Sequence, residues 1–306
     1  MEPAIDQAYP LMGKAIMKRT IFLLGILAVV FAMLFAFNSN AAAADSPTPV
    51  YVQPGQVSGT WTNDNLYYVT GDIQIAEGET LTIEEGTTIL FDNGASLMVD
   101  GTLVANGAEN GTIVFGANSS APWAGYWEGI VVNSTGVATL KNVNVSYAFV
   151  SLFVNDGTLA VQDVNIADTY VGIRIIESGA ETNLTLSDIT IENYWTYGIH
   201  VRNLDQAIRF SLANSELMGA YGADGVMIEA GDDLNGTADA TFNNVKIGGG
   251  FTAVNVLATL DIKLSVLDCT FTAQDDVAVA ADSLFGSVEL VIDGSVIDGS
   301  NSDQSY

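Results

Sequence analysis

Residues 186–191 read Leu-Ser-Asp-Ile-Thr-Ile, and their pattern (apolar, any, Asn or Asp, small or branched, any, apolar) recurs through the second half of the chain. Its third position falls, in order, at Asn142, Asp163, Asp188, Asn214, Asn244, Asp268 and, as a degenerate copy, Gly294. Successive copies are 21 to 30 residues apart. Asn, Asp and Gly adopt the left-handed backbone conformation at least cost, so each copy predicts a sharp turn between two strands. A repeat of this length made of strands and turns predicts a β-solenoid.

Apolar residues two positions apart mark the strands, because side chains alternate between the two faces of a strand. The first half shows this spacing in pairs such as Ile73/Ile75 and Leu81/Ile83. In the repeat, a second strand is expected at Leu152/Val154, Ile173/Ile175, Ile199/Val201, Val226/Ile228, Val254/Val256 and Val277/Val279. The six-residue repeat of left-handed solenoids is absent. We therefore predict an all-β chain, a single-stranded right-handed parallel β-helix with three strands per coil, over residues 61–306.

Two stretches of the first half carry a family resemblance. Residues 71–91, which include Thr80-Leu-Thr-Ile83 and Gly86-Thr-Thr-Ile89, resemble the opening coils of secreted right-handed parallel β-helix proteins of the pectate-lyase-like superfamily. Residues 97–107 resemble them too, and the likeness extends over about residues 60–300. It implies the fold and a place on the prokaryotic cell surface. It implies no single activity, since the superfamily includes lyases, glycosidases, epimerases, adhesins and scaffolds.

The amino-terminal segment has the order of a secretory signal. Lys14, Lys18 and Arg19 precede an uncharged run at 20–37, and small residues follow at 41–44. The run is long for a signal and slightly short for a membrane span, so residues 1–44 are either a cleaved signal peptide or a retained anchor. Both alternatives predict a secreted or cell-surface protein. Residues 45–60 are rich in Pro, Ser and Gly and are expected to form a linker.

The charge of the chain limits its partners. The 306 residues include 36 acidic and 9 basic side chains, for a net charge of −27, which repels nucleic acid and excludes it as a partner. Cys269 is the only cysteine, so no intramolecular disulfide forms. No zinc-type Cys/His cluster or calcium loop is present, and no cofactor is expected. Calcium held loosely by Asp275 and Asp276 is the open alternative.

One group of charged residues could carry catalysis. The residues between buried positions of the second strand point outward, and coils lie about 4.8 Å apart, so Arg174 should neighbour His200 and Arg202 should neighbour Glu229. Asp224 lies in the turn that enters this strand and could supply a further carboxylate. For the carbohydrate-active members of the superfamily that this chain resembles, bases beside carboxylates on one such face imply a polysaccharide lyase or glycoside hydrolase. A simple cross-strand salt bridge explains Arg202 and Glu229 equally well.

Aromatic residues form the second candidate site. They stand seven positions after successive turns, at Phe149, Tyr170, Trp195, Tyr221 and Phe251. This spacing predicts a stack of rings along the solenoid, which would stabilise the fold if it were buried. An outward-facing stripe would instead suit flat sugar rings. The candidate glycan-binding residues are Tyr170, Tyr194, Trp195, Tyr197 and Tyr221.

The remaining sequence features concern surface residence and assembly. Glycosylation sequons begin at Asn110, Asn118, Asn133, Asn144, Asn183 and Asn235. The last coil, at 288–297, has little chain after it to cover its edge. The alternatives are a truncated reading frame, a missing downstream domain, or end-to-end self-association through this coil. The sequence thus predicts an extracellular β-helix with a structural, adhesive or glycan-contacting role and with polysaccharides or surface glycans as partners. The alternative is an enzyme that cleaves polysaccharide near Arg174, His200 and Arg202.

Overall fold

The computed structural model describes residues 46–178, 181–203, 205–220, 222–231, 236–272 and 277–298. The expected signal or anchor segment and the individual residues Tyr221, Asn235, Asp275 and Asp276 lie outside the described residues. The chain divides into two compact units, Met1–Ser46 and Pro47–Tyr306, and the account below concerns the second. In the part that is described, no helix is long and apolar enough to cross a membrane.

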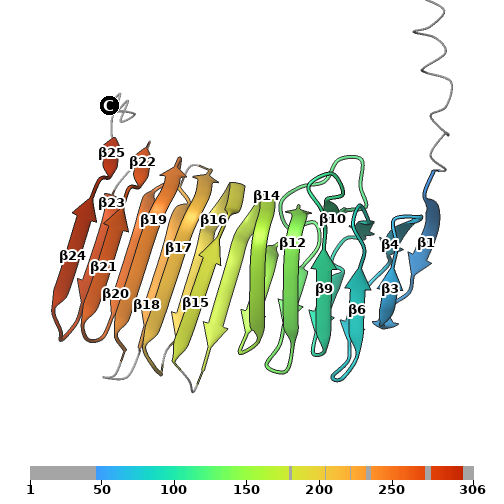
Figure 1. Cartoon of the computed structure of the whole chain (residues 1–306), viewed down its shortest axis with the longest axis horizontal. Coiled ribbons are helices and arrows are strands. Elements are labelled where there is room, and N and C mark those ends of the chain that lie inside the picture. Colours follow the sequence, from blue (N-terminus) through green and yellow to red (C-terminus); the bar gives the residue numbers. More distant parts are fainter. Residues whose placement is uncertain are drawn as a thin grey trace, which may run out of the picture. The chain divides into compact units, whose positions relative to one another are not determined.

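The second unit is a solenoid of parallel strands stacked in three ladders (Figure 1). The first ladder contains β1 (Thr48–Val52), β4 (Asn65–Val69), β7 (Thr88–Phe91), β10 (Ile113–Ala117), β22 (Thr270–Thr272) and β25 (Val296–Asp298). The second contains β2 (Gly55–Gln56), β5 (Ile73–Ile75), β8 (Ser96–Val99), β11 (Gly129–Val132), β13 (Val150–Asn155), β18 (Asp224–Ala230), β20 (Thr252–Ala258) and β23 (Val277–Ser283). The third contains β3 (Gly59–Trp61), β6 (Thr80–Ile83), β9 (Thr102–Asn106), β15 (Thr182–Ser187), β21 (Ile262–Leu267) and β24 (Val288–Asp293).

Five long strands bend and contribute to more than one ladder. They are β12 (Val137–Ser146), β14 (Thr158–Glu177), β16 (Ile189–Asn203), β17 (Ile208–Gly219) and β19 (Ala238–Gly248). The backbone turns from the third ladder into the first in the left-handed conformation, with φ of 48° at Asn142, 53° at Asp163, 57° at Asp188, 49° at Asn214, 54° at Asn244 and 52° at Asp268. The predicted turns are therefore confirmed. The prediction of a right-handed parallel β-helix with three strands per coil is confirmed with them.

The core is a continuous apolar column inside the coils. Inward residues of consecutive coils stack in register, as Leu152, Ile173, Ile199 and Val226 do along the second ladder. All four are fully buried. Burial of inward positions coil after coil supplies the main driving force of the fold.

Two expectations differ from the structure. Residues 45–60 were expected to be a linker, but β1 pairs with β4 and β2 pairs with β5, so this segment forms part of the first coil. In the last coil the register places Val279 beside Val254 and Val277 beside Thr252. The expected buried pair Val277/Val279 is therefore wrong, and Val277 is exposed.

Candidate functional site

Aromatic rings form a stripe along the amino-terminal ends of the second-ladder strands. Phe149, Tyr170 and Trp195 occupy this position in three successive coils, with ring centroids 5.2 Å and 6.2 Å apart. Their exposed fractions are 46%, 39% and 60%, so the rings face solvent. Phe251 lies immediately before β20 and is also exposed. We call Phe149, Tyr170 and Trp195 the aromatic stripe.

A loop before β11 packs against the aromatic stripe. A Cβ atom at Gly125 would lie 3.1 Å from the ring of Tyr170 and 3.4 Å from that of Phe149, and φ at Gly125 is +82°. Both the close approach of the backbone to the rings and the left-handed conformation therefore require glycine. Trp123 is exposed on the same loop and meets Tyr126 edge-on, with ring centroids 4.9 Å apart. The sequence pattern missed this contribution, because a loop outside the repeat provides it.

The structure corrects one of the candidate glycan-binding residues. Tyr194 is completely buried and points into the core, whereas its neighbour Trp195 is exposed. Ladder pairing slips beside Tyr194, between Glu192 and Tyr194, and Asn193 adopts a φ of 53°. This irregularity breaks the simple alternation of faces and turns the Tyr194 ring inward. Burial, followed by the nearby charge of Asp224, raises the pKa of Tyr194.

The charged candidates meet on the outward face of the second ladder. Arg174 is opposite His200 and Arg202 is opposite Glu229, so both expected neighbour pairs are present. His200 Nε2 lies 2.6 Å from Glu229 Oε2, and Arg202 Nε lies 3.8 Å from the same oxygen. Tyr197 covers His200, with ring centroids 4.7 Å apart.

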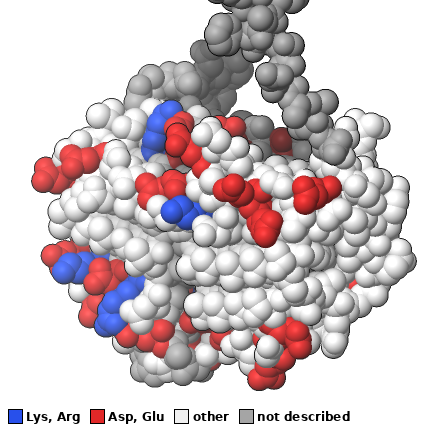
Figure 2. Space-filling view, turned by 45° about the vertical axis from the view of Figure 1, so that its right-hand side comes forward, with Lys and Arg blue, Asp and Glu red and all other residues white. Residues whose placement is uncertain are grey.

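The electrostatics of this cluster centre on Glu229. The hydrogen bond from His200, followed by the charges of His200, Arg202 and Arg174, lowers the pKa of Glu229 against the opposing effect of burial. Burial and the charges of Asp224 and Glu229 raise the pKa of Tyr197. Figure 2 shows acidic side chains spread over one face of the molecule and the few basic ones next to acidic atoms. The cluster thus differs from the rest of this acidic surface, because its basic side chains outnumber its carboxylates around Glu229.

Access to the cluster is uneven. The side chain of His200 is 8% exposed, whereas those of Arg202 and Glu229 are 36% and 31% exposed. The guanidinium of Arg174 lies 5.9 Å from the centre of the Phe153 ring, and its Nε is buried without a hydrogen-bond partner among the described residues. A molecule arriving from solvent meets Arg202 and Glu229 before it meets His200. Asp224 is the first residue of β18 and accepts a hydrogen bond from the backbone N–H of Thr252, the first residue of β20, at 3.1 Å.

Among the sequons, the described residues separate into two kinds. Asn110 and Asn183 are exposed. The side-chain amides of Asn118 and Asn133 instead donate hydrogen bonds to Asp92 at 2.7 Å and Asp100 at 2.6 Å. Asn144 is partly buried and accepts a hydrogen bond from Asn165 at 3.0 Å. Glycan attachment remains a prediction, and the exposed Asn110 and Asn183 are its first candidates.

The described residues contain no group of three or more His, Cys, Asp or Glu side chains placed to hold a metal ion. Cys269 is buried, and burial raises the pKa of its thiol.

Comparison with known proteins agrees with this architecture. Residues 55–158 match the family model of the pectate-lyase like beta helix domain. These residues run from β2 to the start of β14 and form the first coils of the β-helix. A search of the curated proteins finds no match to this β-helix.

Among solved structures, this β-helix is similar to the Streptococcus pneumoniae surface protein and adhesin PfbA, with 13% identity over 82% of this chain and 91% of that chain. The TM-score is 0.18, and a likeness at this level assigns no role to this β-helix.

Proposed function

We propose that this chain is an extracellular or cell-surface β-helix that contacts glycans through the aromatic stripe. The observation that supports the proposal is the exposure of Phe149, Tyr170 and Trp195 in consecutive coils. A stack that served stability alone would be buried, because burial is what makes aromatic rings stabilising. A contiguous exposed apolar patch on a soluble surface marks an interaction site.

The geometry of the aromatic stripe suits an extended polymer of sugars. Its ring centroids are 5.2 Å and 6.2 Å apart, and the rings are tilted 43° and 38° to one another, so each offers part of one face to solvent. Pyranose rings have flat C–H faces that pack on aromatic rings, and hydroxyl groups that stay hydrated at their edges. The basic, apolar and small-residue order of residues 14–44 supports export of the chain to where such polymers are found.

Binding of the full chain to a panel of neutral and acidic polysaccharides tests the proposal. We expect Trp195→Ala and Tyr170→Ala each to weaken binding about 2- to 10-fold, which corresponds to the ~0.5–1.5 kcal/mol of one aromatic contact. Tyr51→Ala is the matched control, since Tyr51 is 65% exposed and stacks on Tyr68 outside the aromatic stripe. Equal affinities for the parent chain and the Trp195→Ala and Tyr170→Ala variants would refute the proposed site.

A second candidate function is polysaccharide cleavage on the same face. The 2.6 Å contact between His200 and Glu229, with Arg174 and Arg202 beside it, supports this alternative because it provides a base and a carboxylate within proton-transfer distance. New reducing ends released from the panel by the parent chain, and lost in Arg174→Ala and Glu229→Gln, would support cleavage. No release across the panel, with glycan binding retained, would leave the binding function alone.

A further inference from the structure

The third ladder is interrupted halfway along the solenoid, while the other two ladders continue. Residues 158–162 of β14 pair with β12 on one side, and β15 pairs with β17 on its far side. No ladder pair joins residues 158–162 to β15, and both segments lie wholly within the described part of the chain. We call the space between residues 158–162 and residues 183–187 the seam.

Two inward side chains at the amino-terminal end of the seam are less buried than those one coil away, whereas Leu186 near its other end is fully buried. Leu159 and Leu184 are half-buried. Their counterparts Ala138, in the coil before, and Phe210, in the coil after, are 0% and 2% exposed. The amino-terminal end of the seam therefore opens the apolar core of the solenoid to solvent.

Backbone groups with no partner in the ladder point into the seam from both sides. In a parallel strand, the N–H and C=O of one residue point to the same neighbour and alternate along the chain. The Thr158 N–H donates to Gly136 on the β12 side, so Leu159 and Val161 face the seam. The Thr182 N–H donates to Ala207 on the β17 side, so Asn183 and Thr185 face the seam from the other edge.

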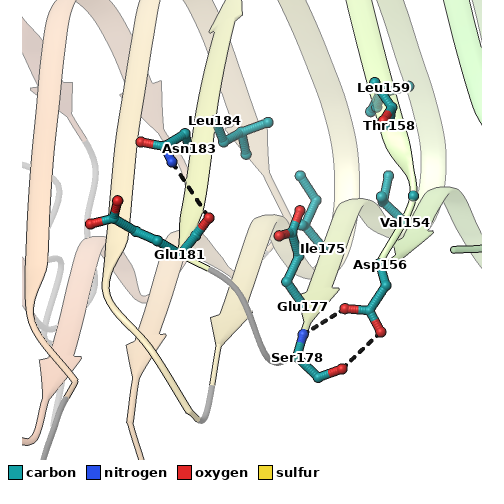
Figure 3. Close-up of a pocket in the computed structure, with 11 residues that line it drawn as sticks. Val154, Asp156, Thr158, Leu159, Ile175, Glu177, Ser178, Glu181, Asn183 and Leu184 are labelled. Atoms are coloured by element: carbon teal, nitrogen blue, oxygen red, sulfur yellow. Dashed lines mark hydrogen bonds between the residues drawn. The ribbon is translucent and has the colours of Figure 1, made fainter.

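A cavity of about 410 Å³ lies at the amino-terminal end of the seam, between residues 158–159 and residues 183–184. Figure 3 shows Thr158 and Leu159 on one side of it, with Val154 below them, Asn183 and Leu184 on the other side, and Ile175 from the second ladder between the two sides. Pockets that hold ligands have volumes of roughly 300–1,000 Å³. The cavity is thus large enough for the end of a bound peptide rather than for water alone.

Carboxyl groups gather where the two edge strands begin. Asp156, Glu177 and Glu181 line this end of the cavity. Asp156 accepts hydrogen bonds from the backbone N–H of Ser178 at 2.6 Å and its hydroxyl at 2.9 Å, and Glu181 pairs with Arg209 at 2.5 Å. Glu177 has no ion-pair partner among the described residues, and burial, followed by the charge of Asp156, raises its pKa. A cation placed here would meet an uncompensated carboxyl group.

We propose that the seam binds the first residues of an extended peptide as an additional parallel strand, with an apolar residue facing the core beside Leu159 and Leu184 and a positive charge at its amino end. Unpaired backbone groups on two facing edges are the features that recruit a peptide by strand addition. The carboxyl groups fix the direction, because a parallel strand places its amino end beside Glu177 and an antiparallel one would place its carboxylate there.

The test uses the full chain and a synthetic hexapeptide, Lys-Val-Thr-Val-Thr-Val, with a free amino end and a fluorophore on its carboxyl-terminal amide. Fluorescence anisotropy should show saturable binding, weakened about tenfold when the peptide is acetylated and begins with Glu instead of Lys. Glu177→Gln should weaken binding of the Lys peptide about 3- to 10-fold. The same binding by both peptides would overturn the proposed direction and site.

The backbone contact is tested by Thr185→Pro, with Thr185→Ala as the matched control. Proline removes the seam-facing N–H of Thr185 and leaves the pairing of β15 with β17 in place, so only the proline variant should lose affinity, about 2- to 10-fold. Hydrogen exchange gives an independent readout that needs no variant. The amides of Asn183 and Thr185 should exchange quickly in the free chain and slow on addition of the peptide. Protection of these amides without peptide, equal to that of β17 amides, would mean that the two edges pair directly and would overturn the proposal.

Discussion

At the scale of single residues, Tyr194 shows how a ring fills the core at a local cost. Its hydroxyl oxygen is buried without a hydrogen-bond partner among the described residues, and a Cβ atom at Gly219 would lie 2.8 Å from its ring. A buried unsatisfied polar group costs about 1–3 kcal/mol. We expect Tyr194→Phe to raise the free energy of unfolding by about 1 kcal/mol, measured by denaturant titration. Tyr197→Phe, in a half-buried ring, should change it little, and a loss of stability in Tyr194→Phe would contradict the assignment.

Glu229 predicts how stability depends on pH. Its pKa in the folded chain is lowered from 4.5, first by the hydrogen bond from His200, so its contribution is present above pH 4.5 and is lost as the pH falls through the lowered value. Glu229→Gln should reduce the free energy of unfolding by about 1–3 kcal/mol at neutral pH, and the difference from the parent chain should shrink in acid. Glu216→Gln is the control, because its ion pair with Lys246 is exposed and worth little. A difference in unfolding free energy between the parent chain and Glu229→Gln that grows in acid would contradict this role of Glu229.

At the scale of elements, the turns between the third and first ladders combine backbone conformation with side-chain stacking. Asn214 has a φ of 49°, and its Oδ1 accepts a hydrogen bond from Asn244 at 3.0 Å. Asn214→Ala should cost about 1–2 kcal/mol of unfolding free energy, while Asn214→Gly should cost less, because glycine keeps the left-handed conformation. Asn165→Ala is the control: Asn165 donates a similar hydrogen bond, to Asn144, from a strand. Equal losses in all three variants would show that the backbone conformation is not the main contribution.

The same elements show which features can be predicted from sequence. The turn at Asn214 could be predicted because it depends on the conformational preference of one residue. The aromatic stripe could be predicted because aromatic residues recur at the same position of the repeat. The inward direction of Tyr194 could not, since it depends on the pairing slip after Glu192. The seam was missed because residues 158–163 have the same alternation as paired strands, and pairing between coils is set by distant residues. The strands at 48–56 were hidden by Pro and Gly, which mark turns elsewhere.

At the scale of the whole molecule, the apolar column of the solenoid reaches the surface at the last coil. Val288, Leu290, Ile292 and Ile297 are 43–48% exposed, whereas the residues paired with them in the coil before are buried. Exposed apolar residues beside unpaired strand edges favour association with another β-structure. We therefore expect the full chain to associate with itself in a concentration-dependent way.

Charge sets the conditions for this association, since a chain with a net charge of −27 repels its own copies. Added salt screens that repulsion, so the mean mass measured by analytical ultracentrifugation should rise with both protein and salt concentration. Leu290→Glu should shift the population toward monomer, because it places a charge in the apolar contact. Val137→Glu adds the same charge at an exposed position of β12, well away from the last coil, and should leave the self-association nearly unchanged. A mass that does not depend on concentration, or equal effects of the two substitutions, would exclude the last coil as the contact surface.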